Sequence, residues 1–381
     1  MKRVLHIASF TGNIGDNASN VGFRKILFHF FPDGCEFTSL ELRKFYTNYT
    51  RPDKRFFDKE FADLANQHDL VVFGGGGILS FDVEHSVTGT TIDIGENVWG
   101  QIRTPVLITS VGVIASDNIP AGNQEKFQKF IQFLLTRERT MLAFRNDGSR
   151  ALIEHWVDKE RPQAIPEILD SGFFYDASGK TYDALPQRYI AINLSSEQIH
   201  RGGGEILIDE DTYYNEIRKV LQHILDITDL TIVFVPHIHG DLSATIKALQ
   251  GLLDYSIRER VQVAPHVQSD KGADLLFSIY KNSTLTLGTR FHSNVCSLAM
   301  GVPTVGLIAQ PRVRAMYESL GLHDSYVLLD GEFGDGLIEK IGRILGGKEL
   351  VTLATRDSVI EAERQKTVNQ YKDFFSSLGL L

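Results

Sequence analysis

Arg290 and His292 lie two residues apart in the segment LGTRFHSN (residues 287–294), which follows an apolar run and precedes an amphipathic one. A guanidinium fork and an imidazole that can donate or accept a proton suit phosphate and carboxylate ligands. A lone histidine is more often a buried structural side chain. Here the neighbouring arginine and the position after a strand favour an anion site with an acid–base group.

A second candidate anion site lies in FRNDGS (residues 144–149), also after an apolar run. Arg145 would point toward the carboxyl end of the strand, and Asp147 and Ser149 can cap the next helix. An arginine beside a helix N-terminus binds anions well. The alternative is an Arg145–Asp147 ion pair of little energetic value, and without further support this alternative is favoured.

Two glycine-containing loops follow predicted strands. In TGNIGDN (residues 11–17) the spacing differs from a dinucleotide-binding G-x-G-x-x-G loop, and Asp16 would repel a pyrophosphate. Asn13 and Asp16 suit hydroxyl groups, while the competing interpretation is that Asp16 or Asn17 caps the following helix. In FGGGGIL (residues 73–79), Gly74–Gly77 predict a close approach of a ligand or of another chain segment to the backbone.

His237, His239 and Asp241 form an H-x-H-x-D cluster in VPHIHGD (residues 235–241). Imidazoles and a carboxylate are good metal ligands. The alternative is a polar loop that contacts substrate, and we favour it because no further compact ligand set is visible. Cys35 and Cys296 are the two cysteines, too few for a thiolate metal cluster or a disulfide framework.

Composition excludes several classes of protein. The formal net charge of −9 argues against a general nucleic-acid or anionic-membrane binder but permits a small basic pocket. No apolar run reaches the 18 residues of a membrane span. The start, MKRVLHIASFTGNIGD, reads as a first strand rather than a signal peptide, because Gly12, Asn13 and Asp16 interrupt it. We therefore expect a cytoplasmic location.

Short apolar runs alternate with amphipathic segments, which predicts parallel strands joined by crossover helices. The predicted strands are residues 4–8, 70–73, 106–109, 141–144, 189–194, 230–236, 285–288 and 304–308. The predicted helices are residues 17–31, 125–135, 147–156, 213–227, 244–253, 273–280, 294–300 and 359–375.

The pattern lapses into Gly, Ser, Asp, Lys and Pro at residues 173–186, which we interpret as a linker. The fold class is thus α/β, with two Rossmann-like doubly wound domains at residues 1–175 and 185–357. A C-terminal helix follows at residues 358–381. Ligands of such sheets bind at the carboxyl ends of the strands, so the expected site is the cleft between the domains.

Together these segments resemble the polysaccharide pyruvyl transferase family. The matching motifs are GNIGDNA, VVFGGGGIL, RNDGS, VPHIHGD and TRFHSNVCSLAMGVPTVGL, in the order of the family and spanning residues 4 to about 320. The resemblance implies a GT-B-like fold, phosphoenolpyruvate as donor, a sugar or glycan acceptor that is free or lipid-linked, and no metal or other cofactor.

Roles follow from the resemblance and the motif positions. His292 is the candidate general acid, and Asp16 orients or deprotonates the acceptor hydroxyl. The C-terminal domain is the expected donor side and the N-terminal domain the expected acceptor side. The donor-binding candidates are Arg145, Arg290, Arg312 and Ser149. The acceptor-binding candidates are Asn13, Gly75, Gly76, Gly77, His237 and His239.

One departure from the family concerns residues 308–312, IAQPR, where relatives commonly carry Y-x-x-K. Arg312 would replace the lysine, and Gln310 departs from the pattern. Arg and Lys are not interchangeable at an anion site, so the donor geometry and the acceptor class depend on this stretch.

Three other functions compete with this one. A GT-B glycosyltransferase would use a nucleotide-sugar donor, yet no acidic ribose partner is visible in a matching motif. A metal-dependent hydrolase would use His237, His239 and Asp241. A catalytically inactive sugar-binding protein is disfavoured by the pair of Arg290 and His292.

Overall fold

A computed structural model describes residues 1–80, 82–114, 119–154, 165–200, 208–348 and 350–381. The chain divides into two units. Unit 1 comprises Met1–Thr11, Ser19–Phe174 and Glu363–Leu381, and unit 2 comprises Gly12–Ala18 and Tyr175–Ala362. The chain therefore passes from one unit to the other four times along its length.

Unit 1 contains a parallel six-stranded sheet in the order β2-β1-β3-β5-β7-β8. Its strands are β1 (Lys2–Ala8), β2 (Cys35–Glu41), β3 (Leu70–Gly74), β5 (Val106–Val111), β7 (Thr140–Arg145) and β8 (Glu167–Ile168). A separate pair joins β4 (Leu79–Ser80) to β6 (Val113–Ile114).

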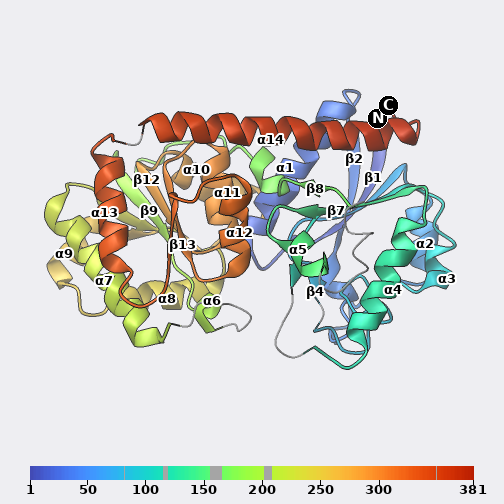
Figure 1. The fold of residues 1–381 in the computed structure, drawn as a ribbon, viewed down its shortest axis with the longest axis horizontal. Coiled ribbons are helices and arrows are strands. Elements are labelled where there is room, and N and C mark those ends of the chain that lie inside the picture. Colours follow the sequence, from blue (N-terminus) through green and yellow to red (C-terminus); the bar gives the residue numbers. More distant parts are fainter. Residues whose placement is uncertain (81, 115–118, 155–164, 201–207, 349) are drawn as a thin grey trace. The chain divides into compact units, whose positions relative to one another are not determined.

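The helical elements that contribute to unit 1 surround this sheet (Figure 1). They are α1 (Ile14–Phe30), η1 (Leu42–Phe45), α2 (Lys59–Ala65), α3 (Glu96–Trp99), α4 (Asn123–Leu135), α5 (Ser149–Glu154), η3 (Ser171–Phe174) and the last part of α14 (Leu350–Ser377). The first residues of α1 and the first part of α14 belong to unit 2.

Both faces of the sheet in unit 1 are buried. Neighbouring residues of a strand point to opposite faces, and on β1 such neighbours enter two different apolar clusters. On β1, Leu5 packs into one apolar cluster with Phe73 and Trp99, and Val4 packs into another with Phe23. Helices on both faces are the mark of a doubly wound sheet.

Unit 2 contains a second parallel six-stranded sheet, in the order β11-β10-β9-β12-β13-β14. Its strands are β9 (Tyr189–Asn193), β10 (Thr231–Phe234), β11 (Val261–Val263), β12 (Leu285–Gly288), β13 (Thr304–Ile308) and β14 (Tyr326–Leu328). Its helices are α6 (Glu197–His200), α7 (Glu210–Ile227), α8 (His239–Leu249), α9 (Asp254–Arg260), α10 (Ser269–Lys281), α11 (Phe291–Ala299), α12 (Pro311–Ser319) and α13 (Gly334–Leu345).

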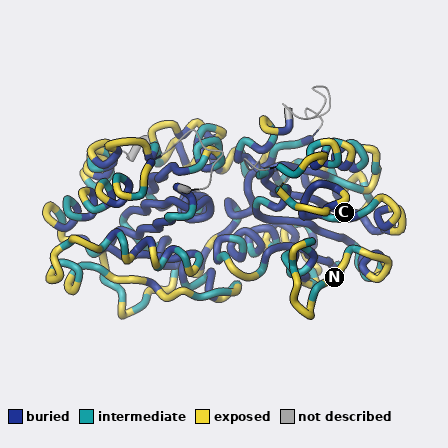
Figure 2. The backbone as a smooth tube through the Cα atoms, turned by 90° about the horizontal axis from the view of Figure 1, so that it is seen from below, coloured by how far each residue is buried: buried dark blue, intermediate teal, exposed yellow. Residues whose placement is uncertain are grey.

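Burial follows the strands in each unit. Figure 2 shows buried backbone in the interior of each unit and exposed backbone on the outer loops. In unit 2 the alternating residues Ile190, Ile192, Leu285 and Leu287 enter one core together with Tyr213 of α7. The alternating α/β pattern of the sequence is thus confirmed as two doubly wound parallel sheets.

Several element boundaries differ from the predictions. The helix predicted at 17–31 begins three residues earlier, at Ile14, and the one predicted at 359–375 begins at Leu350. The helix predicted at 147–156 begins at Ser149, and its end at Trp156 lies outside the described residues. The edge strands β2, β8, β11 and β14 were not predicted, because short or half-polar runs lack a clear apolar pattern.

Candidate active site

The strand order of each sheet reverses at one point, and candidate segments lie at both points. In unit 1 the chain forms β2 on one side of β1 and β3 on the other, and in unit 2 the reversal lies between β9 and β12. Ligands of open parallel sheets bind outside the carboxyl ends of strands at such positions. The glycine loop follows β3 and the Arg290 segment follows β12. Each unit therefore has one candidate region.

Arg290 is held at the carboxyl end of β12 by a buried carboxylate. It is the residue before α11 and only 6 % exposed. Its Nε donates to both oxygens of Asp241, at 3.0 and 2.8 Å, and its Nη2 donates to Oδ1 at 2.7 Å. Burial disfavours the charge of Arg290, but Asp241 and then Glu197 outweigh it and raise the pKa of the guanidinium. Two of the three guanidinium nitrogens of Arg290, Nε and Nη2, thus bind Asp241.

Asp241 is itself fixed from several sides. It is 1 % exposed and lies in the first turn of α8. One of its oxygens, Oδ2, accepts from the backbone N–H groups of His237 at 2.9 Å and Ile238 at 3.3 Å, and from Asn193 Nδ2 at 3.2 Å. A carboxylate with this many donors is a permanent part of the fold.

Glu197 provides a second, looser partner for Arg290. Nη1 of Arg290 donates to Glu197 Oε1 at 3.3 Å. The side chain of Glu197 is 40 % exposed, whereas that of Arg290 is 7 % exposed. Nε and Nη2 both contact Asp241, so Nη1 is the nitrogen of the guanidinium that is left to contact the partly exposed Glu197.

Asn193 ties together the ends of the three central strands of unit 2. It is the last residue of β9 and fully buried. Its Oδ1 accepts from Arg290 N at 3.0 Å, its Nδ2 donates to Val235 O at 3.0 Å, and its carbonyl accepts from Thr289 Oγ1 at 2.7 Å. Asn193 therefore fixes the turn that presents Arg290.

His292, the candidate general acid, and Asp16, the candidate that orients or deprotonates the acceptor hydroxyl, lie close together in unit 2. His292 is the second residue of α11, and its Nδ1 lies 3.9 Å from Asp16 Oδ1. The two side chains are 5 % and 13 % exposed. Gly15 permits this approach, because a Cβ at that position would lie 2.6 Å from Cβ of His292. An imidazole beside a carboxylate can act as a general acid or base.

Asn13, rather than Asp16 or Asn17, caps α1, which corrects the capping alternative. Its side chain accepts from Gly15 N at 3.0 Å, and Ile14 N donates to the carbonyl of His237 at 3.2 Å. The start of α1 is grouped with unit 2 by these contacts. The carboxylate of Asp16, in the first turn of α1, thus lies 3.9 Å from His292 Nδ1 without being the cap of the helix.

His237 and His239 have different environments. His237 is fully buried, and its Nε2 lies 3.0 Å from Tyr280 Oη. Burial, and then the charges of Arg290 and His292, lower the pKa of His237 well below its ordinary value, so the ring is neutral. His239 is exposed at the start of α8. Contact of these two histidines with the acceptor remains a prediction. Because His237 is fully buried, it could contact the acceptor directly only after a rearrangement of the side chains around it.

The described residues contain no group of three or more His, Cys, Asp or Glu side chains arranged to hold a metal ion. Within the H-x-H-x-D segment, Asp241 binds Arg290 and His237 faces Tyr280. The geometry of this segment therefore gives no support to the metal-dependent hydrolase.

Arg312 lies at the same edge of the sheet as Arg290. It is the second residue of α12 and half-buried, four residues after the end of β13, which pairs with β12. Carboxyl ends of neighbouring parallel strands meet at one edge, so both arginines serve the same side of unit 2.

Arg145 in unit 1 belongs to a fully buried ionic cluster. Its Nε donates to Asp147 Oδ2 at 2.5 Å and its Nη1 to Asp170 Oδ2 at 3.3 Å, with all three side chains at most 2 % exposed. Ser149 Oγ donates to Asp147 and accepts from Val113 N at 2.7 Å. These contacts are internal, so the donor-binding roles of Arg145 and Ser149 remain predictions.

The glycine loop after β3 requires glycine for its backbone conformation. Gly75 and Gly76 have φ values of 77° and 85°, which favour glycine. Gly76 O accepts from Gly112 N at 3.0 Å, and a Cβ at Gly112 would lie 2.7 Å from Arg145 Nε. The loop therefore packs on the segment that covers the Arg145 cluster, and Gly77 lies half-buried beside it.

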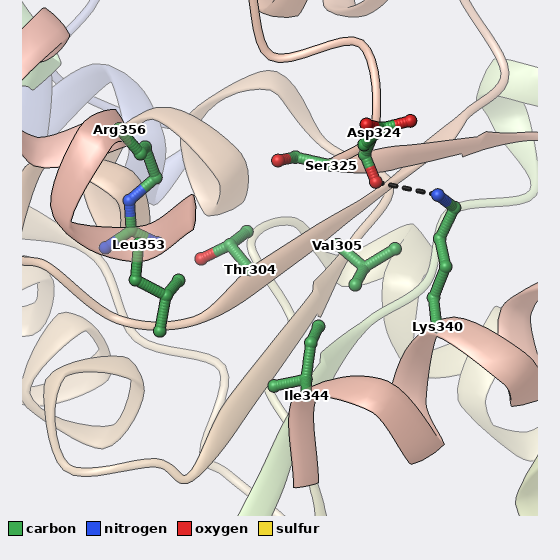
Figure 3. A pocket seen from close by; sticks show the side chains of 8 residues that line it. All are labelled: Thr304, Val305, Asp324, Ser325, Lys340, Ile344, Leu353 and Arg356. Carbon is green, nitrogen blue, oxygen red and sulfur yellow. Dashed lines mark hydrogen bonds between the residues drawn. The ribbon is translucent and has the colours of Figure 1, made fainter. Parts of the chain in front are cut away.

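Sequence reasoning missed Asn193, Glu197, Asp170 and the role of Asp241 as partner of Arg290. A signal existed for Asn193, since a polar residue ends the apolar run YIAIN, but nothing in the sequence indicates which carboxylate pairs with which arginine. A small pocket between β13, α13 and α14 is unrelated to this site (Figure 3). Thr304 and Ser325 place it at the amino ends of β13 and β14, the opposite edge of the sheet.

Comparison with solved structures identifies the fold. A glycosyltransferase from Rickettsia africae has a TM-score of 0.55 at 11% identity, covering 99% of this chain and 98% of its own. UDP-GlcNAc 2-epimerase from Neisseria meningitidis has a TM-score of 0.53 at 11% identity, with 98% and 100% covered. The Methanocaldococcus jannaschii UDP-GlcNAc 2-epimerase has a TM-score of 0.52 at 13% identity, with 90% and 92% covered. The predicted GT-B-like fold is confirmed.

No curated protein matches the chain. Within the described residues, no helix combines the length and the apolar character that a membrane span needs. The family model described as polysaccharide pyruvyl transferase matches residues 13–310, most of the chain. This match confirms the resemblance and the assignment to the transferases. The chain belongs to the polysaccharide pyruvyl transferase family.

Proposed function

We propose that this protein transfers the pyruvyl group of phosphoenolpyruvate to sugar hydroxyls and forms a pyruvate ketal during polysaccharide synthesis. The observation that carries the proposal is the pairing of His292 with Asp16 beside Arg290, at the point where the strand order of unit 2 reverses. Family membership supports a polysaccharide or its precursor as the class of acceptor, and the proposal includes both free and lipid-linked sugars. The cytoplasmic location belongs to the same proposal.

Phosphoenolpyruvate carries a phosphate and a carboxylate, so it needs several cationic or N–H donors. In unit 2, Nη1 of Arg290, the guanidinium of Arg312 and the N-terminus of α11 all lie at the carboxyl edge of the sheet. A helix N-terminus presents free N–H groups to an anion. This edge therefore suits the donor.

The chemistry needs a proton at the methylene carbon of the donor. His292 delivers it, and the double bond becomes a methyl group attached to an oxocarbenium-like carbon. A sugar hydroxyl attacks that carbon and gives up its proton, for which Asp16 is the acceptor. The bond between this carbon and the phosphate oxygen then breaks, and inorganic phosphate leaves. A second hydroxyl of the same sugar adds to the carbon and closes the ketal, and its proton returns to His292, which gave up a proton in the first step.

Ligand-dependent stability tests the donor. At a concentration roughly 100-fold above Kd, phosphoenolpyruvate should stabilise the folded protein by about 2.7 kcal/mol. Thermal unfolding with phosphoenolpyruvate and, separately, with UDP-sugars measures this. A shift with UDP-sugars alone would replace the proposal with the nucleotide-sugar glycosyltransferase, which shares the fold.

Turnover tests the reaction. Phosphate release from phosphoenolpyruvate should require an acceptor, and a panel of glycans and lipid-linked sugars identifies which one. Phosphate release without any acceptor in the panel would indicate hydrolysis instead of transfer.

A further inference from the structure

The two carboxylates that contact Arg290 differ in how firmly they are held. Asp241 is 1 % exposed and accepts three hydrogen bonds besides those from the guanidinium. Removing it from Arg290 would break the start of α8 and leave a buried charge without a partner. Asp241 is therefore a fixed partner that no ligand displaces.

Among the described residues, Glu197 is held by one ion pair, at 3.3 Å from Arg290, and its side chain is 40 % exposed. It begins α6, four residues after the end of β9. An exposed carboxylate in one long ion pair gains little from it, so its exchange for another anion costs little.

The charges explain why such an exchange matters. Arg290 contributes one positive charge, whereas Asp241 and Glu197 each contribute a negative one when ionised. With both carboxylates in place, Arg290 and its two partners together carry one excess negative charge, which opposes the approach of a phosphate or carboxylate to Nη1. Once Glu197 moves away, Nη1 of Arg290 can donate to the ligand in its place.

We propose that Glu197 is a placeholder anion: it occupies the open arm of Arg290 in the empty enzyme and leaves when the phosphate or carboxylate of the donor binds. Glu197 is thus a residue that sets donor affinity, and Asp241 is the positioning residue that keeps Arg290 in place throughout. The identity of the donor rests on the proposed function, whereas the exchange of anions on Arg290 does not.

The test compares Glu197→Gln with wild type in calorimetric titrations of the full chain, first with phosphoenolpyruvate and then with inorganic phosphate. Glutamine keeps the size of the side chain and removes its charge. Removing a like charge near a bound anion should tighten binding of both ligands by about tenfold, and at least threefold.

Glu318→Gln is the matched control. Glu318 is also a partly exposed glutamate in an ion pair with an arginine, at 2.7 Å from Arg314, and its removal changes the net charge equally. Anion binding should stay at the wild-type level in this variant. If it tightens as much as in Glu197→Gln, a general charge effect replaces the placeholder.

The remaining outcomes are separable. Weaker or unchanged binding in Glu197→Gln, with an unchanged melting temperature, overturns the proposal, because Glu197 would then hold the ligand or be irrelevant to it. If inorganic phosphate binds more tightly to the variant while phosphoenolpyruvate binds to neither protein, the placeholder stands and the proposed function fails. Should Glu197→Gln unfold, Glu197→Asp, which withdraws the carboxylate by one methylene, should show the same tightening.

Discussion

Arg145 in unit 1 and Arg290 in unit 2 look alike in sequence and differ in the structure. Arg145 ends β7 and Arg290 lies two residues after β12, and each precedes a helix and contacts two carboxylates. Both partners of Arg145 are buried, at 1% and 0% exposure, whereas one partner of Arg290 is 40% exposed. Arg145 is therefore enclosed within the fold, while Arg290, itself buried, has one partner that reaches the surface.

The difference shows that the second carboxylate, rather than the arginine, determines what each site can do. A buried Arg with two buried Asp residues is an internal network whose members are all needed for stability. A buried Arg with one fixed and one exposed carboxylate can exchange the exposed one for a ligand. If this view is correct, changes at Arg145 should mainly lower stability, whereas changes around Arg290 should mainly affect donor binding and turnover.

The largest effect is expected from His292, which lies on the Arg290 side of the comparison. His292→Ala and His292→Asn should lower kcat by a factor on the order of 10² to 10⁴, because neither side chain delivers a proton near neutral pH. Donor affinity should be largely kept, since the arginines remain. Parallel measurements of kcat, donor Kd and melting temperature check this.

A stable His292→Asn enzyme that binds donor and turns over at nearly the normal rate would remove the general-acid role. A lower melting temperature with normal turnover would instead indicate a packing role.

In unit 1, the largest expected change is a loss of stability in Arg145→Met. It leaves Asp147 and Asp170 buried without their cation, which costs about 3–5 kcal/mol of unfolding free energy. Urea denaturation measures the loss. Donor affinity of the protein that remains folded should be close to that of wild type.

Arg290→Lys is the counterpart in unit 2. Lysine cannot reproduce the fork to Asp241 and also reach the ligand, so donor affinity should fall by about tenfold with a smaller loss of stability. The comparison breaks down if Arg145→Met weakens donor binding as strongly as Arg290→Lys does.

Each unit also buries a neutral histidine, and His6 of unit 1 predicts an acid-sensitive fold. Burial, and then the charge of Arg24, lower the pKa of His6 from 6.5 to about 3. Between these values the unfolded chain binds a proton that the folded chain does not, so stability is complete above pH 6.5 and falls as pH decreases toward 3. The loss amounts to about 2 kcal/mol at pH 5.

His6→Leu should abolish this part of the acid sensitivity. Both ring nitrogens of His6 are buried without a hydrogen-bond partner among the described residues, so stability at neutral pH should not decrease. Urea denaturation at pH 7 and pH 5 compares the variant with wild type and with His29→Gln, a change at an exposed histidine. Equal acid sensitivity in His6→Leu and wild type would assign the effect to other groups.

The smallest effect is expected from chelation. Activity should be unchanged after exhaustive treatment with EDTA, because Asp241 is bound to Arg290 and His237 to Tyr280, and the proposed chemistry uses cations of the protein. Loss of activity with EDTA and recovery with a divalent ion would show that the Arg290 region works through a metal.

The sequence was sufficient for the repeating α/β pattern and for the positions of the motifs, because buried parallel strands are short apolar runs and their polar ends are visible. It placed His292 and Asp16 in one site only through the family resemblance, since the two lie far apart in the chain. It could not predict which carboxylates neutralise Arg145 and Arg290. That pairing depends on strand order and side-chain packing, which residue spacing does not encode.

The last helix has a consequence for how the protein is made. Tyr371 and Phe375 of α14 are fully buried in the core of unit 1 beside Phe23, and Tyr371 Oη lies 2.6 Å from Thr109 Oγ1. Unit 2 ends at Ala362, so its residues leave the ribosome before these two. Domains generally fold in the order of synthesis. Here unit 1, whose first strand precedes unit 2 in the chain, is completed after it, and a premature stop before codon 371 would leave unit 1 without these two core residues.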